Sequence, residues 1–144
     1  MSSEPTVIGA GRLTETVQQL TRIMQALVEQ GKTTGAVTLA DWQPLAELCA
    51  TDGFERIGPF HDRLDWAGYS AMLTDWVNHS EGWLPVVKSI TEAPGVVYMQ
   101  CEEMITQGDT VFPFYSLSLY RFNERGQITS IAVYMQNEAM APPA

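Results

Sequence analysis

Residues 111–136 read VFPFYSLSLYRFNERGQITSIAVYMQ. Two runs rich in β-branched and aromatic residues flank NERG, which is a compact turn signal. Two further runs of this kind, LPVVKSIT at 84–91 and VVYMQCEEMIT at 96–106, come before them, and the turn signals EAPG and QGDT separate the runs. We therefore expect the second half of the chain to form an antiparallel meander of four strands.

The first half of the chain has helical spacing instead. Apolar residues from Leu13 to Val28 predict a first helix that ends at Gly31. Asp41 is expected to cap a second helix with Pro44 in its first turn. A third helix, capped by Asp65, would bury the stripe Trp66, Tyr69, Leu73, Trp76 and Val77. This order predicts an α+β fold, with three N-terminal helices packed on one face of a curved antiparallel sheet.

The chain of 144 residues is the length of one domain with its own core. Apolar residues make up 45% of it and charged residues 17%, which is typical of a globular protein. We expect a flexible leader at 1–11, a single domain at 12–136 and a tail at 137–144. Cys49 and Cys101 lie in apolar segments without metal-type spacing, so we expect two reduced, buried thiols.

The net charge is −9, from 8 Lys and Arg against 17 Asp and Glu. Such a field repels nucleic-acid backbones and anionic membranes, so we expect neither partner. The chain has neither a membrane-length apolar run nor the pattern of a secretory signal, which favours a cytoplasmic protein. It also lacks a Gly-rich phosphate loop, CxxC, HExxH and GxSxG, and it has 2 His. We therefore expect no metal and no cofactor.

The element order, together with RFNERGQITSIAVYMQ at 121–136, resembles the nuclear transport factor 2 (NTF2)-like superfamily. The resemblance is to the branch of SnoaL-type polyketide cyclases, ketosteroid isomerases and limonene-epoxide hydrolases. Those proteins end with an aromatic-rich strand, an acid–x–Gly turn and a strand that runs from Ile to Tyr. The resemblance covers roughly residues 12–136. It implies a cone-shaped fold whose helices and sheet enclose an apolar pocket for a hydrophobic small molecule.

The catalytic residues of the ketosteroid isomerases are replaced here. Their oxyanion-hole Tyr on the first helix corresponds to Met24, and their general-base Asp before a Pro corresponds to Gly58. Their second Asp corresponds to Ser118. The resemblance therefore argues against steroid isomerisation by that set of residues.

The limonene-epoxide hydrolases use an Arg and an Asp two residues apart on a middle strand, and a second Asp after the last Tyr. The corresponding positions are Cys101, Glu103 and Gln136. One carboxylate is kept, as Glu103, without its usual partners.

Glu103 interrupts an apolar strand face formed by Val97, Met99, Cys101 and Ile105. A carboxyl group in an apolar pocket can serve as a general acid or base, so we take Glu103 as the first catalytic candidate. Two structural alternatives stay open. Glu103 could bend into solvent at the strand end, or it could pair with Arg121 or Arg56.

His61 and Asp62 are the second catalytic candidates, because they lie in a loop that the resemblance places near the pocket mouth. The alternative is that both are solvated loop residues. His79, at the expected end of the third helix, is better explained as a capping residue.

On the strand at 111–122, one face presents Phe114, Ser116, Ser118 and Tyr120, and the resemblance turns this face toward the cavity. Hydroxyls among aromatic rings could orient a substrate, although serines also make space in packed cores. We add three further candidate substrate-binding residues: Met24, Met135 and Gln136. The opposite face, with Tyr115, Leu117 and Leu119, predicts a homodimer that forms through the sheet.

Two functions remain open. The first is a cofactor-free enzyme that acts on a hydrophobic small molecule by acid–base catalysis, as an isomerase, cyclase, dehydratase or epoxide hydrolase. The second is a non-catalytic module for ligand binding or assembly that has kept the cone and lost the catalytic residues.

Overall fold

The computed structural model describes residues 4–137. The first half contains β1 (Thr6–Ile8), α1 (Arg12–Thr34), a 3₁₀ helix η1 (Leu39–Trp42), α2 (Gln43–Ala46), β2 (Glu55–Ile57), β3 (Arg63–Leu64) and α3 (Trp66–His79). The second half contains β4 (Trp83–Ala93), β5 (Val96–Gln107), β6 (Thr110–Phe122) and β7 (Ile128–Gln136). The predictions for residues 1–3 of the leader and 138–144 of the tail lie outside the described residues.

The four long strands form the predicted antiparallel meander, and all seven strands join one sheet in the order β1-β4-β5-β6-β7-β2-β3. The predicted antiparallel sheet is confirmed for the four long strands, but two pairings that involve short strands are parallel. β1 pairs with β4 in parallel, and β2 pairs with β7 in parallel. β1 and β2 have three residues each. That length is too short to show the alternation by which a strand is recognised in a sequence.

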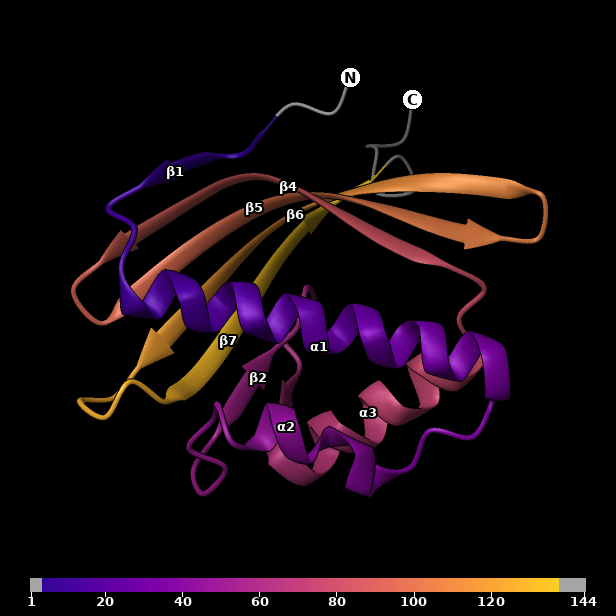
Figure 1. Cartoon of the computed structure of the whole chain (residues 1–144), viewed down its shortest axis with the longest axis horizontal. Coiled ribbons are helices and arrows are strands. Elements are labelled where there is room, and N and C mark those ends of the chain that lie inside the picture. Colours follow the sequence, from indigo (N-terminus) through magenta and orange to yellow (C-terminus); the bar gives the residue numbers. More distant parts are fainter. Residues whose placement is uncertain (1–3, 138–144) are drawn as a thin grey trace.

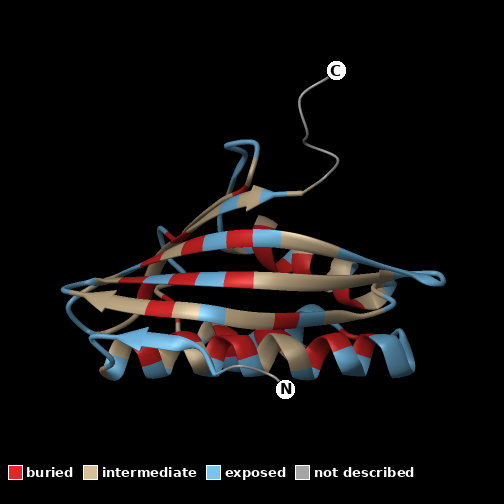
Figure 2. Cartoon of the chain, turned by 90° about the horizontal axis from the view of Figure 1, so that it is seen from above, coloured by how far each residue is buried: buried red, intermediate tan, exposed pale blue. Residues whose placement is uncertain are grey.

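The sheet curls around the helices (Figure 1). α1 runs beneath the concave face, while α3 and α2 lie farther below, beside β2. Register shifts between Val87 and Ser89 and between Arg121 and Phe122 interrupt the ladder, and such irregularities bend strands. In the view from above, the long strands alternate between buried and exposed residues (Figure 2). The concave face therefore belongs to the core, and the convex face is open.

Helix α1 continues through Gly31 to Thr34, so the predicted end at Gly31 was wrong. The helix ends instead at Gly35, whose φ of 64° is the left-handed conformation typical of a helix C-cap. Gly31 has another role, because a Cβ at this position would lie 2.1 Å from the carbonyl oxygen of Val77. The missing side chain allows α1 and α3 to cross in direct backbone contact.

The segment between α1 and β2 differs from the prediction as well. Thr38 is the N-cap of η1, and Asp41 is the N3 residue of the same helix. The two form a capping box, in which the Asp41 carboxylate accepts from the Thr38 amide at 2.8 Å. Asp41 therefore caps η1 and not α2, which is a single turn with Pro44 at its start. Leu45 and Cys49 are buried beneath this turn.

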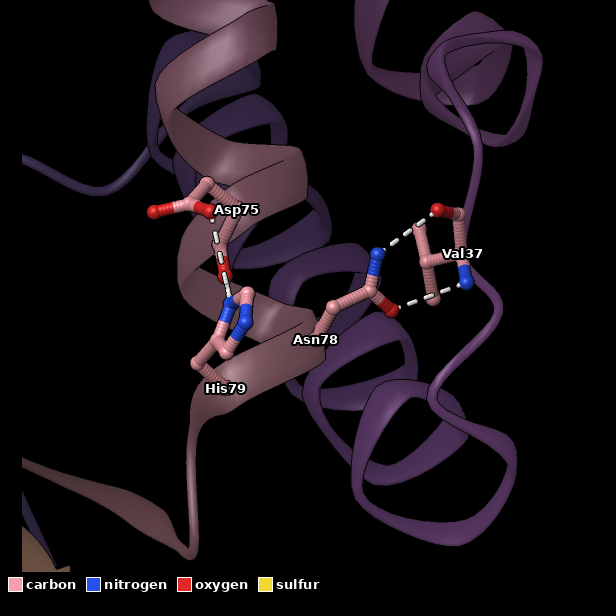
Figure 3. Close-up of polar contacts among 4 residues, drawn as sticks. All are labelled: Val37, Asp75, Asn78 and His79. Atoms are coloured by element: carbon pink, nitrogen blue, oxygen red, sulfur yellow. Dashed lines mark hydrogen bonds and ion pairs between the residues drawn. The ribbon is translucent and has the colours of Figure 1, made fainter.

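Helix α3 agrees with its prediction. The Asp65 carboxylate accepts from the Gly68 amide at 2.8 Å, and Tyr69, Leu73 and Val77 are buried. Near the end of α3 the Asn78 amide binds both backbone groups of Val37, which attaches the segment after α1 to α3 (Figure 3).

Figure 3 also draws the contact between His79 and Asp75 near the end of α3. Nδ1 of His79 lies 2.8 Å from the carbonyl oxygen of Asp75 and 3.3 Å from the Asp75 carboxylate. This contact confirms His79 as a helix-end residue.

The start of α1 is held by a carboxylate from the sheet. Oε1 of Glu92, on β4, accepts from the amide and from the hydroxyl of Thr14, both at 2.7 Å. Desolvation would raise the pKa of Glu92, but the hydrogen bonds from Thr14 and from the amides of Gly11 and Leu13 lower it more. A negative charge at the amino end of a helix also interacts favourably with the helix dipole.

Candidate active site

A cavity of about 340 Å³ lies between the concave face of the sheet and helices α1 and α3. This volume is at the lower end of the range for small-molecule sites. The sheet side is formed by alternate residues of neighbouring strands. β5 contributes Met99, Cys101, Glu103 and Ile105; β6 contributes Ser116, Ser118 and Tyr120; and β7 contributes Ile131, Val133 and Met135.

The helices close the other side. α1 contributes Leu20, Thr21 and Met24, and α3 contributes Tyr69, Met72, Leu73 and Trp76. These positions recur at helical spacing, so they fall on the one stripe of each helix that faces the sheet. Most of the lining is therefore apolar, and the few polar groups stand among methionine and aromatic side chains.

Glu103 lies in this lining and is half-buried. Its Oε1 accepts a hydrogen bond from the Trp83 indole nitrogen at 2.7 Å. The Trp83 ring packs edge-on against Trp76, with centroids 5.2 Å apart and planes at 79°. Within residues 4–137 no ion pair joins Glu103 to Arg56 or Arg121, so the pairing alternative is not what the structure contains. The strand face and the Trp83 indole hold the carboxylate instead.

Arg56 is a polar residue of the cavity that we considered from the sequence only as a partner for Glu103. It lies on β2, and its side chain is 15% exposed. Its Cζ lies 6.0 Å from the centroid of the Tyr69 ring, and its Nη1 lies 3.8 Å from the Met72 sulfur. β2 is too short to carry a pattern, so no sequence signal placed this guanidinium beside the cavity.

The phenols and thiols of this region are neutral. Burial raises the pKa of Tyr120 above its ordinary value of 10.0. Burial also raises the pKa of Tyr69, and the neighbouring Arg56 opposes this effect in part. For Cys101, burial raises the pKa to about 12, with a smaller contribution from the Glu103 charge. The tyrosines can therefore donate hydrogen bonds to a ligand, whereas the protonated Cys101 is a poor nucleophile.

Both cysteines are free and buried, as predicted. Cys49 lies outside the cavity lining, and burial raises its pKa to about 12. Neither thiol has the features of a reactive cysteine.

Most of the predicted site residues line the cavity, namely Glu103, Met24, Ser116, Ser118, Tyr120 and Met135. Phe114 and Gln136 do not. Phe114 pairs with Glu103 on the concave face, but it is half-buried toward the end of the β5–β6 hairpin. Gln136 pairs with Tyr115 and therefore lies on the convex face, because directly paired residues share one face of a sheet.

His61 and Asp62 lie in the turn between β2 and β3 and are not part of the cavity lining. His61 has a positive φ of 63°, and its Nε2 lies 3.4 Å from Nη2 of Arg63. Asp62 contacts the cavity residue Arg56 at 3.8 Å. The structure thus separates the pair from Glu103, and the catalytic role of His61 and Asp62 stays a prediction.

The convex face of the sheet exposes several large apolar residues, among them Tyr98, Tyr115, Leu117 and Tyr134.

Within residues 4–137, no three or more His, Cys, Asp or Glu side chains are grouped so that they could hold a metal ion. None of the helices described is both long enough and apolar enough to cross a membrane.

No family model and no curated protein matches the sequence. IdmH, a candidate polyketide cyclase from Streptomyces antibioticus, matches the structure with a TM-score of 0.68 and 14% identity, over 88% of this chain and 93% of that one. An LEH-like epoxide hydrolase from M. tuberculosis matches with a TM-score of 0.65 and 11% identity, over 86% and 82%. An NTF2-like protein of unknown function from Burkholderia xenovorans LB400 matches with a TM-score of 0.59 and 14% identity, over 92% and 91%.

These similarities define the class as an α+β cone with helices inside a curved sheet. The fold is the NTF2-like fold, which confirms the fold that the resemblance over roughly residues 12–136 implies. Because one fold supports many activities, the function has to be argued from the cavity itself.

Proposed function

We propose that this protein is a cofactor-free enzyme that acts on a hydrophobic small molecule by acid–base catalysis, with Glu103 as the proton donor or acceptor. One observation carries the proposal: Glu103 is the single carboxylate lining the cavity in the part of the chain that the structure describes. Solved structures with the same fold include a candidate polyketide cyclase and an epoxide hydrolase, which agrees with chemistry of this class.

In this proposal the two oxygens of the Glu103 carboxyl group have different roles. Oε1 accepts from the Trp83 indole, which orients the group. Oε2 is then the oxygen that exchanges a proton with the substrate. The hydroxyls of Ser116, Ser118 and Tyr120 provide donors that can hold a substrate oxygen as charge develops on it.

The proposal is tested by comparing two adjacent carboxylates. Glu103→Gln removes the acid–base group with little change of shape. Glu102→Gln is the matched control, because Glu102 pairs with Tyr115 on the convex face and contacts Lys88 at 3.7 Å. Turnover would be followed by mass spectrometry on a panel of apolar enones, lactones and epoxides. We expect Glu103→Gln to lower kcat by about 10²–10⁴-fold, and Glu102→Gln to leave it unchanged.

A third variant tests the orienting contact. Trp83→Phe keeps an aromatic ring against Trp76 but removes the indole donor. We expect kcat to fall by about tenfold, in line with a hydrogen bond to a charged group worth ~1.5 kcal/mol. Circular dichroism and Tm would establish that each variant is folded. Equal turnover by the Glu103→Gln and Glu102→Gln variants would contradict the proposal.

The alternative is a non-catalytic binding or assembly module. The observation that favours it is the lack of a second carboxylate in the described cavity lining, since paired acids are common in acid–base enzymes. Tight binding of an apolar compound, with no turnover of any panel member by the wild-type protein, would support this alternative.

We further propose that the protein forms a homodimer through the convex face of the sheet. Tyr115 is 46% exposed there and Tyr134 is 62% exposed, so the single chain leaves a large aromatic surface in water. Sedimentation equilibrium would test this assembly, and a stable monomer at micromolar concentration would overturn it.

A further inference from the structure

We infer that the cavity binds a small hydrophobic carboxylate, and that Arg56 forms the ion pair with its carboxylate group. The inference rests on the proposed function, because it specifies the substrate class for the same cavity. It requires binding alone, however, so it can be tested whether or not Glu103 is catalytic.

The first argument is the burial of the charge. Arg56 lines the cavity, and its side chain is 15% exposed. A guanidinium carries five N–H donors and stays charged under all physiological conditions. Removing such a group from water is costly unless oxygen acceptors replace the lost hydration.

The second argument is that, within residues 4–137, the protein supplies few of those acceptors. Oδ2 of Asp62 lies 3.8 Å from Nη1, which is beyond hydrogen-bond distance, and the Asp62 side chain is 52% exposed. The other contacts are the Met72 sulfur at 3.8 Å and the face of the Tyr69 ring. Sulfur is a weak acceptor, and a ring face binds a cation without satisfying its N–H groups. The guanidinium therefore has donors left for a ligand.

The third argument is the position of Arg56 relative to Glu103. Arg56 pairs with Ile131, Ile131 with Tyr120, and Tyr120 with Val97. Glu103 follows Val97 by six residues on β5, so its Cα lies about 20 Å farther along that strand at 3.3 Å per residue. The backbone positions of Arg56 and Glu103 therefore lie toward different ends of the cavity wall.

Between these two ends the cavity wall is apolar, with residues such as Met24, Met99 and Val133. A ligand that matches this wall is amphiphilic. Its carboxylate would meet Arg56, its apolar body would lie along the methionines, and its reacting group would face Glu103. The reverse orientation would bring two carboxylates together at Glu103, which like-charge repulsion opposes.

A neutral phenol beside Arg56 completes this end of the cavity. The Tyr69 ring faces the guanidinium, with its centroid 6.0 Å from Cζ. Tyr69 keeps its proton because burial raises its pKa, so its hydroxyl can donate one hydrogen bond to a ligand oxygen. A bidentate pair with Arg56 supported by a phenol donor is a strong arrangement for carboxylate recognition.

The test compares 2-naphthoate with 2-naphthamide, which have nearly the same shape and differ in charge. Calorimetry, or quenching of the fluorescence of Trp76 and Trp83 in the cavity, would measure the Kd of each compound. We expect the wild-type protein to bind the acid about tenfold or more tightly than the amide. We expect Arg56→Gln to abolish this preference by weakening the acid alone, and Arg56→Lys to keep part of it.

Two control variants show whether the preference for the acid depends on Arg56 itself. Arg63→Gln removes an exposed cation of the same hairpin, which is paired with Glu55, and should leave the preference unchanged. Glu103→Gln should also keep the preference, so a failure of the catalytic proposal would not be mistaken for a failure of this one. Equal Kd values for acid and amide, equal weakening of both by Arg56→Gln, or binding of neither compound would overturn the inference. If the Arg56 variants do not fold, the Kd values of the acid and the amide for the wild-type protein still test whether the cavity prefers the carboxylate.

Discussion

The crossing of α1 and α3 yields a sharp prediction, because it turns an ordinarily stabilising substitution into a damaging one. Gly31 lies inside α1, where Gly→Ala usually gains about 1 kcal/mol from helix propensity. Here the new Cβ would lie 2.1 Å from the Val77 carbonyl oxygen, whereas ordinary contact begins at 3.4 Å. The obstacle is backbone, so no side-chain rotation can relieve it.

The magnitude follows from these two opposing effects. The helices would have to separate by about 1 Å, which disturbs a close-packed core that includes Leu27, Val28 and Val77. Overpacking of this kind costs typically ~1–3 kcal/mol and occasionally more. We expect Gly31→Ala to lower the free energy of unfolding by about 2 kcal/mol, after the propensity gain is subtracted from a cost at the upper end of that range.

The assay is urea denaturation followed by circular dichroism, with the same slope m required for both proteins. Lys32→Ala is the matched control, because this neighbouring residue is exposed and should change stability by less than about 0.5 kcal/mol. Adding Val77→Ala should not rescue Gly31→Ala, since the close atom is the carbonyl oxygen and not the valine side chain. A Gly31→Ala protein as stable as the wild type, or one rescued by Val77→Ala, would refute this account of the crossing.

Two further predictions concern the polar contacts that attach the helices. Asn78→Ala should lower the free energy of unfolding by about 2 kcal/mol, since it removes two partly buried hydrogen bonds to Val37. Asn78→Asp keeps the acceptor, so it should lower the free energy of unfolding about half as much in urea denaturation. Equal losses of stability in the two variants would contradict this prediction. The pKa of Glu92 is lowered in the folded state, so its stabilising contribution is present above its ordinary value of 4.5 and is lost as the pH falls through the lower folded pKa. Glu92→Gln should therefore lower Tm at pH 7, and the Tm difference from the wild type should shrink toward pH 3. Glu47→Gln, at an exposed position, should leave Tm unchanged at both pH values. A Tm difference that does not change with pH would argue against this linkage.

The sequence by itself predicted the four long strands, because each is long enough to show alternation and each is bounded by a clear turn. The same alternation assigned Met99, Cys101 and Glu103 to one face, and the structure has all three in the cavity lining. The cap of α3 at Asp65 was also readable, since capping depends on residues close together in the chain.

Tertiary structure decided what depends on residues far apart in the chain. β1 and β2 exist because β4 and β7 offer free edges, and three-residue segments carry no periodicity of their own. From the sequence alone Gly31 is predicted to end the helix. Only the crossing of α1 and α3 shows that this glycine lies against the backbone of Val77. In the same way, the Trp83 indole reaches Glu103 across paired strands, and Arg56 reaches the cavity from the short strand β2. The strand pattern determined which face carries the acid, while packing between distant segments determined its hydrogen-bond donor and the cation that shares its cavity.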